Sequence, residues 1–307
     1  MPLEAVLEQL RRQDIKITRD MIYSLSRLDR AATAELRAAW PTLPLDRRQA
    51  IVVEAGDTAE DDVEVDFDDL FKVALRDDDS TVKVAAIQGL WEYTTRDLIT
   101  PLIDLLEKDS DPGVRSTAAL ALGRFVLMGE FDELPASEQD RAEEALRRVY
   151  DRDGEDLEVR ARALESIGAS SKPYVGELIG AAHQSGNYRL RLSAIHAMGR
   201  SCDERWLPVL LQEMTDDEAE VRFEAVGATG RIADESTINT IAELLEDEDR
   251  EVQLAAIEAL GHIGGRRVKQ HLRLMLKSEE PALREAAETA LDEADLNIDP
   301  LTAEYRI

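Results

Sequence analysis

Two stretches, EVRFEAVGATG at residues 220–230 and EVQLAAIEALG at residues 251–261, are near copies spaced thirty-one residues apart. In each, an apolar anchor residue is followed by small and aliphatic residues four and five positions later and by glycine nine positions later. The anchor and positions +4, +5 and +8 after it fall on one face of an α-helix. The stretches therefore predict a recurring helix with one buried face.

This unit recurs over most of the chain. The steps between successive anchors are 32, 45, 31, 31, 31 and 31 residues, and such a period is typical of a repeat architecture. A second apolar stripe, such as Ile238 and Ile241, follows each anchor helix and predicts its partner in a hairpin. We predict an all-α fold, an α-solenoid of antiparallel helical hairpins with a period of ~31 residues. The structural repeat positions are the anchors Val82, Val114, Val159, Leu190, Val221, Val252 and Leu283, and the glycines Gly123, Gly168, Gly199, Gly230 and Gly261.

The residues that recur at fixed distances from each anchor predict how the helix begins and ends. We expect the glycine to end the anchor helix, because a residue without Cβ tolerates the left-handed conformation of a C-terminal cap. Acidic residues precede the anchors, and we expect them to cap free backbone N–H groups. These residues are Asp111, Asp156, Asp217 and Asp249.

A basic residue follows most anchors, as Arg222 follows Val221. Its regular offset favours a ladder of ion pairs with acidic residues of the same or the adjacent repeat. A basic binding stripe is the alternative.

The period divides the chain into three regions. Residues 1–76 form a divergent helical N-terminal cap, in which 45–56 is a degenerate repeat helix ending on a glycine. Residues 77–294 carry about six hairpins and a C-terminal capping helix, with an insertion near 128–139 that accounts for the 45-residue step. That insertion is either a binding loop or neutral variation in loop length. Residues 295–307 form a tail.

Composition and charge exclude several classes. Of 307 residues, 44% are hydrophobic and only 5% aromatic, which indicates packed helices rather than disorder. The net charge of −28 repels phosphate backbones and anionic membranes, so we expect neither nucleic acid nor membrane as a partner. A basic protein partner, or simple solubility, explains the acidity. The single cysteine, Cys202, allows no internal disulfide, and no apolar run approaches the ~18 residues of a membrane span. We expect a cytoplasmic monomer.

Four segments carry a family likeness: DPGVRSTAALALGRF (111–125), LEVRARALESIGAS (157–170), AEVRFEAVGATGRI (219–232) and REVQLAAIEALGHIGG (250–265). They resemble HEAT repeats, and most of all the short variety first noted in phycobilisome lyases. The likeness covers residues 77–294. It implies a right-handed superhelix whose second helices line a concave, protein-binding surface.

The resemblance also raises an enzymatic alternative, a phycobilin lyase or a deoxyhypusine-hydroxylase-like oxidoreductase. Members of the hydroxylase type hold two irons with His-Glu dipeptides, whereas none of the four histidines here precedes a glutamate: His183, His196, His262 and His271. The sequence offers no motif for a bilin and no nucleophile with an oriented base. We therefore expect no enzyme, no catalytic residue, no cofactor and no metal.

The sequence analysis thus favours a non-catalytic scaffold or adaptor that binds a protein along the solenoid surface. Aromatic residues near the repeat turns and the basic segment RRVKQHLRLMLK at 266–277 are candidates for that contact, although packing and a solvated helix face are the alternatives. The acidic run at 57–69 is either a docking surface or a solvated connector. The candidate partner-binding residues are Trp91, Tyr93, Phe131, Tyr188, Trp206, Arg266, Arg267, Lys269 and Arg273.

Overall fold

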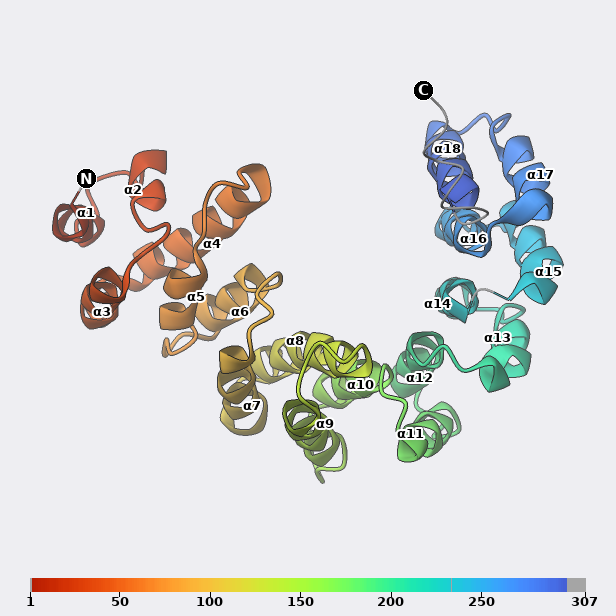
Figure 1. Ribbon diagram of the computed structural model, residues 1–307, viewed down its shortest axis with the longest axis horizontal. Coiled ribbons are helices and arrows are strands. Elements are labelled where there is room, and N and C mark those ends of the chain that lie inside the picture. The colour runs from red at the N-terminus through yellow and green to blue at the C-terminus, as the bar shows by residue number, and fades with distance from the viewer. Residues whose placement is uncertain (1, 233, 297–307) are drawn as a thin grey trace. The chain divides into compact units, whose positions relative to one another are not determined.

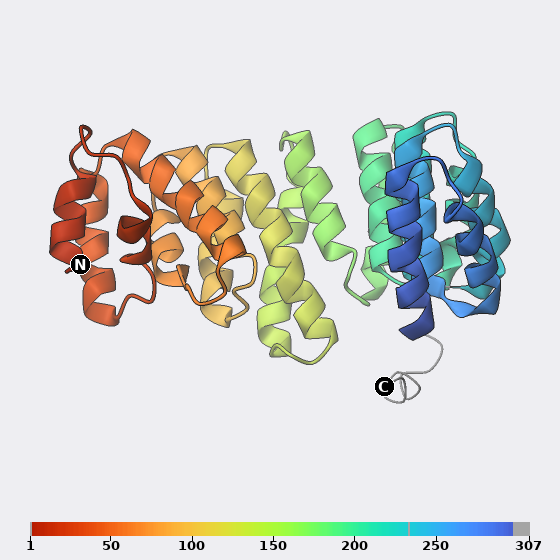
Figure 2. The same cartoon turned by 90° about the horizontal axis from the view of Figure 1, so that it is seen from above.

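The computed structural model describes residues 2–232 and 234–296, and those residues are helical with no β-strand. They fall into two compact units, unit 1 at residues 1–166 and unit 2 at residues 167–307. Each unit is an array of helices stacked side by side (Figures 1 and 2). Within the described part of the chain, no helix is both long and apolar enough to cross a bilayer. The expected all-α solenoid is confirmed.

Unit 1 contains ten α-helices among its described residues, the last of which ends one residue beyond it. They are α1 (Leu3–Leu10), α2 (Arg19–Tyr23), α3 (Arg30–Ala39), α4 (Leu45–Asp61), α5 (Asp68–Ala74), α6 (Ser80–Gly89), α7 (Ile99–Lys108), α8 (Pro112–Glu130), α9 (Ala136–Tyr150) and α10 (Leu157–Ile167).

Unit 2 continues the alternation of short and long helices. They are α11 (Pro173–His183), α12 (Tyr188–Arg200), α13 (Leu207–Glu213), α14 (Ala219–Ile232), α15 (Ile238–Glu243), α16 (Arg250–Ile263), α17 (Gly265–Met275) and α18 (Pro281–Leu296). Single 3-10 turns precede α7, α13 and α15, at Arg96–Leu98, Glu204–Trp206 and Glu235–Thr237.

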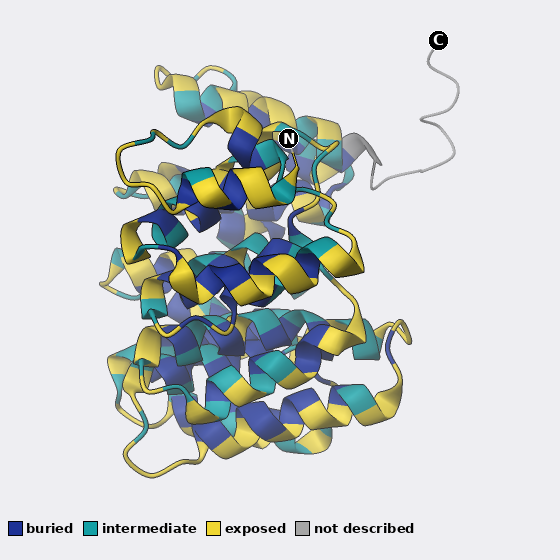
Figure 3. Ribbon diagram, turned by 90° about the vertical axis from the view of Figure 1, so that its left-hand side faces the viewer, coloured by how far each residue is buried: buried dark blue, intermediate teal, exposed yellow. Residues whose placement is uncertain are grey.

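The predicted anchors form the core of both units. All seven are at most 5% exposed, and Val221 and Val252 are fully buried. Figure 3 shows why: each helix turns a stripe of buried residues towards its neighbours and keeps an exposed stripe outside. The apolar stripe read from the sequence is therefore the face that stacks one repeat on the next.

The repeat glycines do not have the role expected of them. Gly123, Gly199, Gly230 and Gly261 lie inside their helices rather than after them. Gly168 does follow its helix, α10, but none of the five has the positive φ of a left-handed cap. Instead, each lies where the next anchor helix comes closest. A Cβ on Gly199 would lie 2.6 Å from the Cα of Ala228. The glycine is required for close helix–helix approach, and the prediction of a C-terminal cap was wrong.

The order of helices in the hairpin also differs from the expectation. The anchor helix packs against the helix before it, as α14 does on α13, α12 on α11 and α18 on α17. It is thus the second helix of its hairpin, not the first. In unit 2 the anchor helices form the inner row of the bend and α11, α13, α15 and α17 the outer row (Figure 1). Because the glycine contacts bring the inner helices close together, the row bends towards them.

Aspartates begin several anchor helices, as predicted. Asp111 accepts hydrogen bonds from the N–H groups of Gly113 and Val114, and Asp249 from those of Glu251 and Val252. Asp156 accepts one from the N–H of Glu158 at 2.9 Å. At α14, Asp216 accepts from the N–H of Glu218 at 2.9 Å, just before the helix, as Asp247 accepts from Asp249 before α16.

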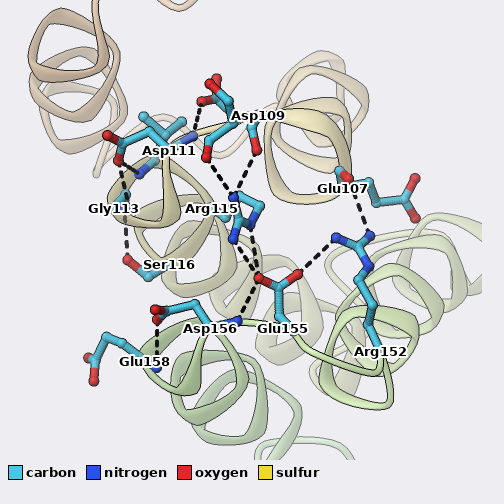
Figure 4. A network of polar contacts seen from close by, with 12 residues as sticks. Glu107, Asp109, Asp111, Gly113, Arg115, Ser116, Arg152, Glu155, Asp156 and Glu158 are labelled. Atoms are coloured by element: carbon cyan, nitrogen blue, oxygen red, sulfur yellow. Dashed lines mark hydrogen bonds and ion pairs between the residues drawn. The ribbon is translucent and has the colours of Figure 1, made fainter.

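The expected ladder of ion pairs is present in both units. The basic residue after one anchor pairs with a carboxylate just before the next anchor helix, as Arg222 does with Asp247 at 2.7 and 2.8 Å. Figure 4 shows the same step in unit 1, where Arg115 contacts Glu155 at 2.6 Å and donates to the carbonyl of Asp109 at 2.9 Å. The other pairs are Arg48–Asp77, Lys83–Asp109 and Arg191–Asp216. Because these cations are paired with carboxylates of the next repeat, they favour the ladder over the alternative of a basic binding stripe.

Two predicted loops are shorter than expected. Helix α4 continues through Gly56 to Asp61, so the acidic run begins inside a helix. The insertion at 128–139 mostly lengthens α8 and α9, and only residues 131–135 connect them. Helical hydrogen bonding absorbs most of the extra residues, and the break falls at residues 131–135, where Asp132 has a φ of 58°. Residues 297–307 of the predicted tail lie outside the described residues.

Candidate binding grooves between neighbouring anchor helices

Unit 2 has a groove between α14 and α16, with His196 of α12 at one end. Its volume is about 280 Å³, and it is lined on the α14 side by Phe223, Glu224 and Gly227. A Cβ on Gly227 would meet nothing within 4 Å, so the missing side chain leaves the groove open. Phe223 is 41% exposed, which is high for a large aromatic ring. The α16 side contributes Glu258 and His262, and Arg231 of α14 also lines the groove, so its charge is mixed.

Unit 1 has a similar groove of about 200 Å³ between α4 and α6. It contains an exposed aromatic ring, Trp91, and two carboxylates, Asp57 and Glu60. A Cβ on Gly56 would again meet nothing within 4 Å. Gly89 lines the groove on the α6 side, and its missing side chain makes room for the ring of Phe71, which a Cβ there would overlap.

The two grooves therefore share an architecture. Each lies between successive anchor helices and combines an open glycine, an exposed aromatic ring and two carboxylates. The repeat accounts for part of this likeness, since positions +3, +6 and +7 of the following anchor helix line both grooves. The aromatic rings and the carboxylates, however, come from different repeat positions in the two units. Such a surface can take a long side chain with an apolar stem and a positive end.

Polar contacts hold parts of both grooves in place. In unit 2, Nδ1 of His196 lies 3.4 Å from a carboxylate oxygen of Glu224. In unit 1, the guanidinium of Arg124 donates to the carbonyls of Leu90 and Trp91 at 2.7 and 2.6 Å, which fixes the turn that carries the Trp91 ring. Burial lowers the pKa of Arg124 to about 10, so the cation persists at neutral pH.

The predicted aromatic residues have different environments. Trp91 is 67% exposed in its groove, and Phe131 is 68% exposed at the end of α8. The hydroxyl of Tyr93 donates to Asp97 at 2.9 Å beneath the ammonium of Lys72. Tyr188 donates to Glu220 at 2.9 Å. Trp206 packs its ring 3.7 Å from the Cβ position of Gly180.

The predicted basic residues separate into two sets. Arg266, Lys269 and Arg273 line one depression on α17. Arg267 instead donates to the side chain of Asn239 on α15 at 2.9 Å. The structure thus brings three of the four together at one depression and turns the fourth towards α15.

The sequence reading missed Phe223, Gly227 and Val53. Comparing the repeats could have pointed to Gly227. It stands at the +6 position after the anchor, where other repeats carry a larger side chain: Gln88, Leu120, His196 or Glu258. A glycine at an outward-facing helix position destabilises the helix relative to alanine, so its presence there indicates a packing or functional requirement. Val53 is 53% exposed at the same position of α4.

In the described residues, no group of three or more His, Cys, Asp or Glu side chains is arranged to bind a metal ion. His183 lies 2.8 Å from a carboxylate oxygen of the buried Glu213, which also pairs with Arg191. That histidine belongs to a polar contact between α11, α12 and α13.

A family model for HEAT repeats matches residues 67–153 and 207–292, more than half of the chain. The chain therefore belongs to the HEAT-repeat family. No curated protein sequence matches it.

Solved structures of helical repeat proteins are similar in fold. The complex of CpcE and CpcF of phycocyanin lyase from Nostoc has 16% identity and a TM-score of 0.52, covering 92% of this chain and 97% of that one. Yeast importin-beta (Kap95p) has 14% identity and a TM-score of 0.54, covering 98% of this chain but 47% of its own. Human deoxyhypusine hydroxylase has 18% identity and a TM-score of 0.37, covering 95% and 96%. At these identities the likeness concerns the fold alone.

Proposed function

We propose that this protein is a non-catalytic, cytoplasmic scaffold that binds a basic segment of a partner protein along its anchor helices. The observation that carries the proposal is the recurrence of one groove design in both units, with an exposed aromatic ring, two carboxylates and an open glycine. HEAT-repeat structures in complexes with proteins, such as that of Kap95 with Nup1, support a binding role for the fold.

The α14–α16 groove suits a lysine or arginine side chain. Glu224 and Glu258 lie on opposite helices and attract a cation between them, against the repulsion of Arg231, which lines the same groove. The ring of Phe223 offers a face for the aliphatic stem or for the guanidinium plane. The net charge of −28 increases the local concentration of a basic segment and favours its association.

Peptide binding tests the proposal directly. The probe is a short fluorescein-labelled peptide of arginine, glycine and serine, measured by anisotropy at low salt, with a citrulline peptide as the uncharged control. We expect Gly227→Leu to block binding, because its side chain fills the groove. Glu258→Gln should weaken binding several-fold, since an ion pair in a partly desolvated groove contributes on the order of 1 kcal/mol.

The matched control is Glu243→Gln, which removes the same charge from an exposed position on α15. Equal weakening by Glu243→Gln and Glu258→Gln would show attraction by net charge alone and contradict the groove. No binding of the arginine peptide at low salt would contradict the proposal as a whole.

The lyase-like enzyme is the alternative function and can be tested with the same preparation. A visible absorption spectrum and a metal analysis of protein purified from its native host detect a bound pigment or iron. A stoichiometric pigment or metal would contradict a purely non-catalytic scaffold.

A further inference from the structure

Helix α17 carries a patch whose charge is opposite to that of the protein. Arg266, Lys269 and Arg273 line a depression of about 830 Å³, with Gln270 between them and Glu235 at the rim. Arg266 and Arg273 are exposed, and neither forms an ion pair with a described residue. By contrast, Arg115, Arg191 and Arg222 are all paired with carboxylates. Arg37 and Arg76 line a pocket of unit 1, but that pocket also contains Asp97, Asp104 and Asp109, whereas Glu235 is the one carboxylate among the described residues that line the α17 depression.

An apolar side chain lies beside this patch. Leu274 is 62% exposed, and it follows Gln270 by four positions, which places the two on the same side of the helix. Val268 and Leu272 are buried on the opposite side. The outer face of α17 therefore combines positive charge with one exposed aliphatic contact, as protein-binding surfaces do.

We propose that this α17 patch is a second interaction surface, which binds an acidic polypeptide segment containing an apolar residue. Charge complementarity selects the acidic partner, and Arg266 and Arg273 can each form a bidentate pair with a carboxylate. Leu274 provides apolar contact that a phosphate backbone does not use. The patch is also short, since the eleven residues of α17 span about 16 Å.

The surrounding charge favours a short acidic peptide over a nucleic acid. A long polyanion would extend from the patch over a surface of net charge −28 and be repelled there. A peptide with its acidic residues confined to a few positions meets only the patch. In unit 2 the patch lies on the outer row, whereas the α14–α16 groove lies between helices of the inner row (Figure 1).

The test uses the full chain and a short fluorescein-labelled oligoglutamate peptide with one central leucine. We expect Arg266→Glu with Arg273→Glu to weaken anisotropy-detected binding by about tenfold or more, because two attractions become repulsions. The matched control is Arg30→Glu with Arg96→Glu, which reverses two exposed arginines of unit 1. Leu274→Ala should weaken binding of the leucine peptide but not that of plain oligoglutamate.

Circular dichroism and thermal melts show whether each variant is folded. Equal effects of the two double variants would overturn the assignment to α17. Tighter binding of a single-stranded DNA of equal charge would overturn the polypeptide class. These outcomes do not depend on binding of the arginine peptide. The proposal for the α17 patch and the proposed function of the grooves can therefore be contradicted independently of each other.

Discussion

Gly230 of α14 and Ala259 of α16 approach so closely that a methyl group on Gly230 would lie 2.7 Å from the Cα of Ala259. The same relation joins Gly199 to Ala228 and Gly168 to Ala197, at 2.6 and 2.8 Å from Cα. In every case the glycine at +9 meets the small residue at +7 of the next repeat. The spacing of the anchor row in unit 2 depends on these contacts.

The first prediction concerns this contact. Gly230→Ala should destabilise the protein by about 1–3 kcal/mol, because the added methyl group overlaps the backbone of α16. The gain in helix propensity, about 1 kcal/mol, offsets only part of that loss. Urea unfolding followed by circular dichroism measures the change.

Gly227→Ala is the control, since it lies on the same helix with open space around it. It should leave stability unchanged or raise it by about 0.5–1 kcal/mol through helix propensity alone. A similar loss in both variants would mean that the close approach to Ala259 is not the cause.

The second prediction concerns the ladder of ion pairs. The side chains of Arg222 and Asp247 are 9% and 7% exposed, so Arg222→Met leaves a buried carboxylate without its partner. We expect a loss of about 3–5 kcal/mol, and a smaller loss when Asp247→Asn is added. Lys108→Met removes an exposed pair with Asp104 and should change stability by less than about 1 kcal/mol. Strict additivity in the Arg222–Asp247 cycle would show no coupling.

The third prediction concerns pH. Burial, and then the charge of Asp66, raise the pKa of Asp68 to about 6. The unfolded chain ionises this group near pH 4, so the folded protein loses stability as the pH rises from about 4 to 6. Asp68→Asn should therefore raise the melting temperature at pH 7 and have no such effect below pH 4. Asp69→Asn, in the same helical turn, is the charge-matched control, and an equal pH-dependent gain there would refute the assignment.

The fourth prediction concerns the α4–α6 groove. Trp91 is 67% exposed and Trp40 only 3%, so acrylamide should quench Trp91 strongly and Trp40 weakly. Trp91→Phe should remove the most readily quenched fluorescence and leave that of Trp206, whose exposure is intermediate. The arginine peptide should protect Trp91 from acrylamide if it occupies this groove. Unchanged quenching at saturating peptide would place the binding elsewhere.

Much of the architecture could be read from local patterns. The anchors, the capping aspartates Asp111 and Asp249, and the paired basic residues recur at fixed offsets, because each depends on neighbours within one or two repeats. The glycine of each repeat was misread for the same reason. A glycine near a helix end suggests a cap, and only the position of Ala228 against Gly199 shows that it is required for packing.

The candidate sites depended more on tertiary structure. Trp91 was singled out from the sequence, but its groove also needs the open space at Gly56, which belongs to a different helix. Phe223 and Gly227 were missed, since a lone substitution within a repeat carries little weight until its exposure is known. Arg267 was grouped with its basic neighbours, although its bond to Asn239 separates it from them.

The sequence by itself determined the helical repeat, its period and the face that each anchor helix buries, because stacking requires the same residues in every unit. Tertiary structure alone decided which helix pairs with which, why the glycines are needed, and where open space and unpaired charge remain. Those features depend on distances between residues of different repeats, and a one-dimensional pattern does not contain such distances.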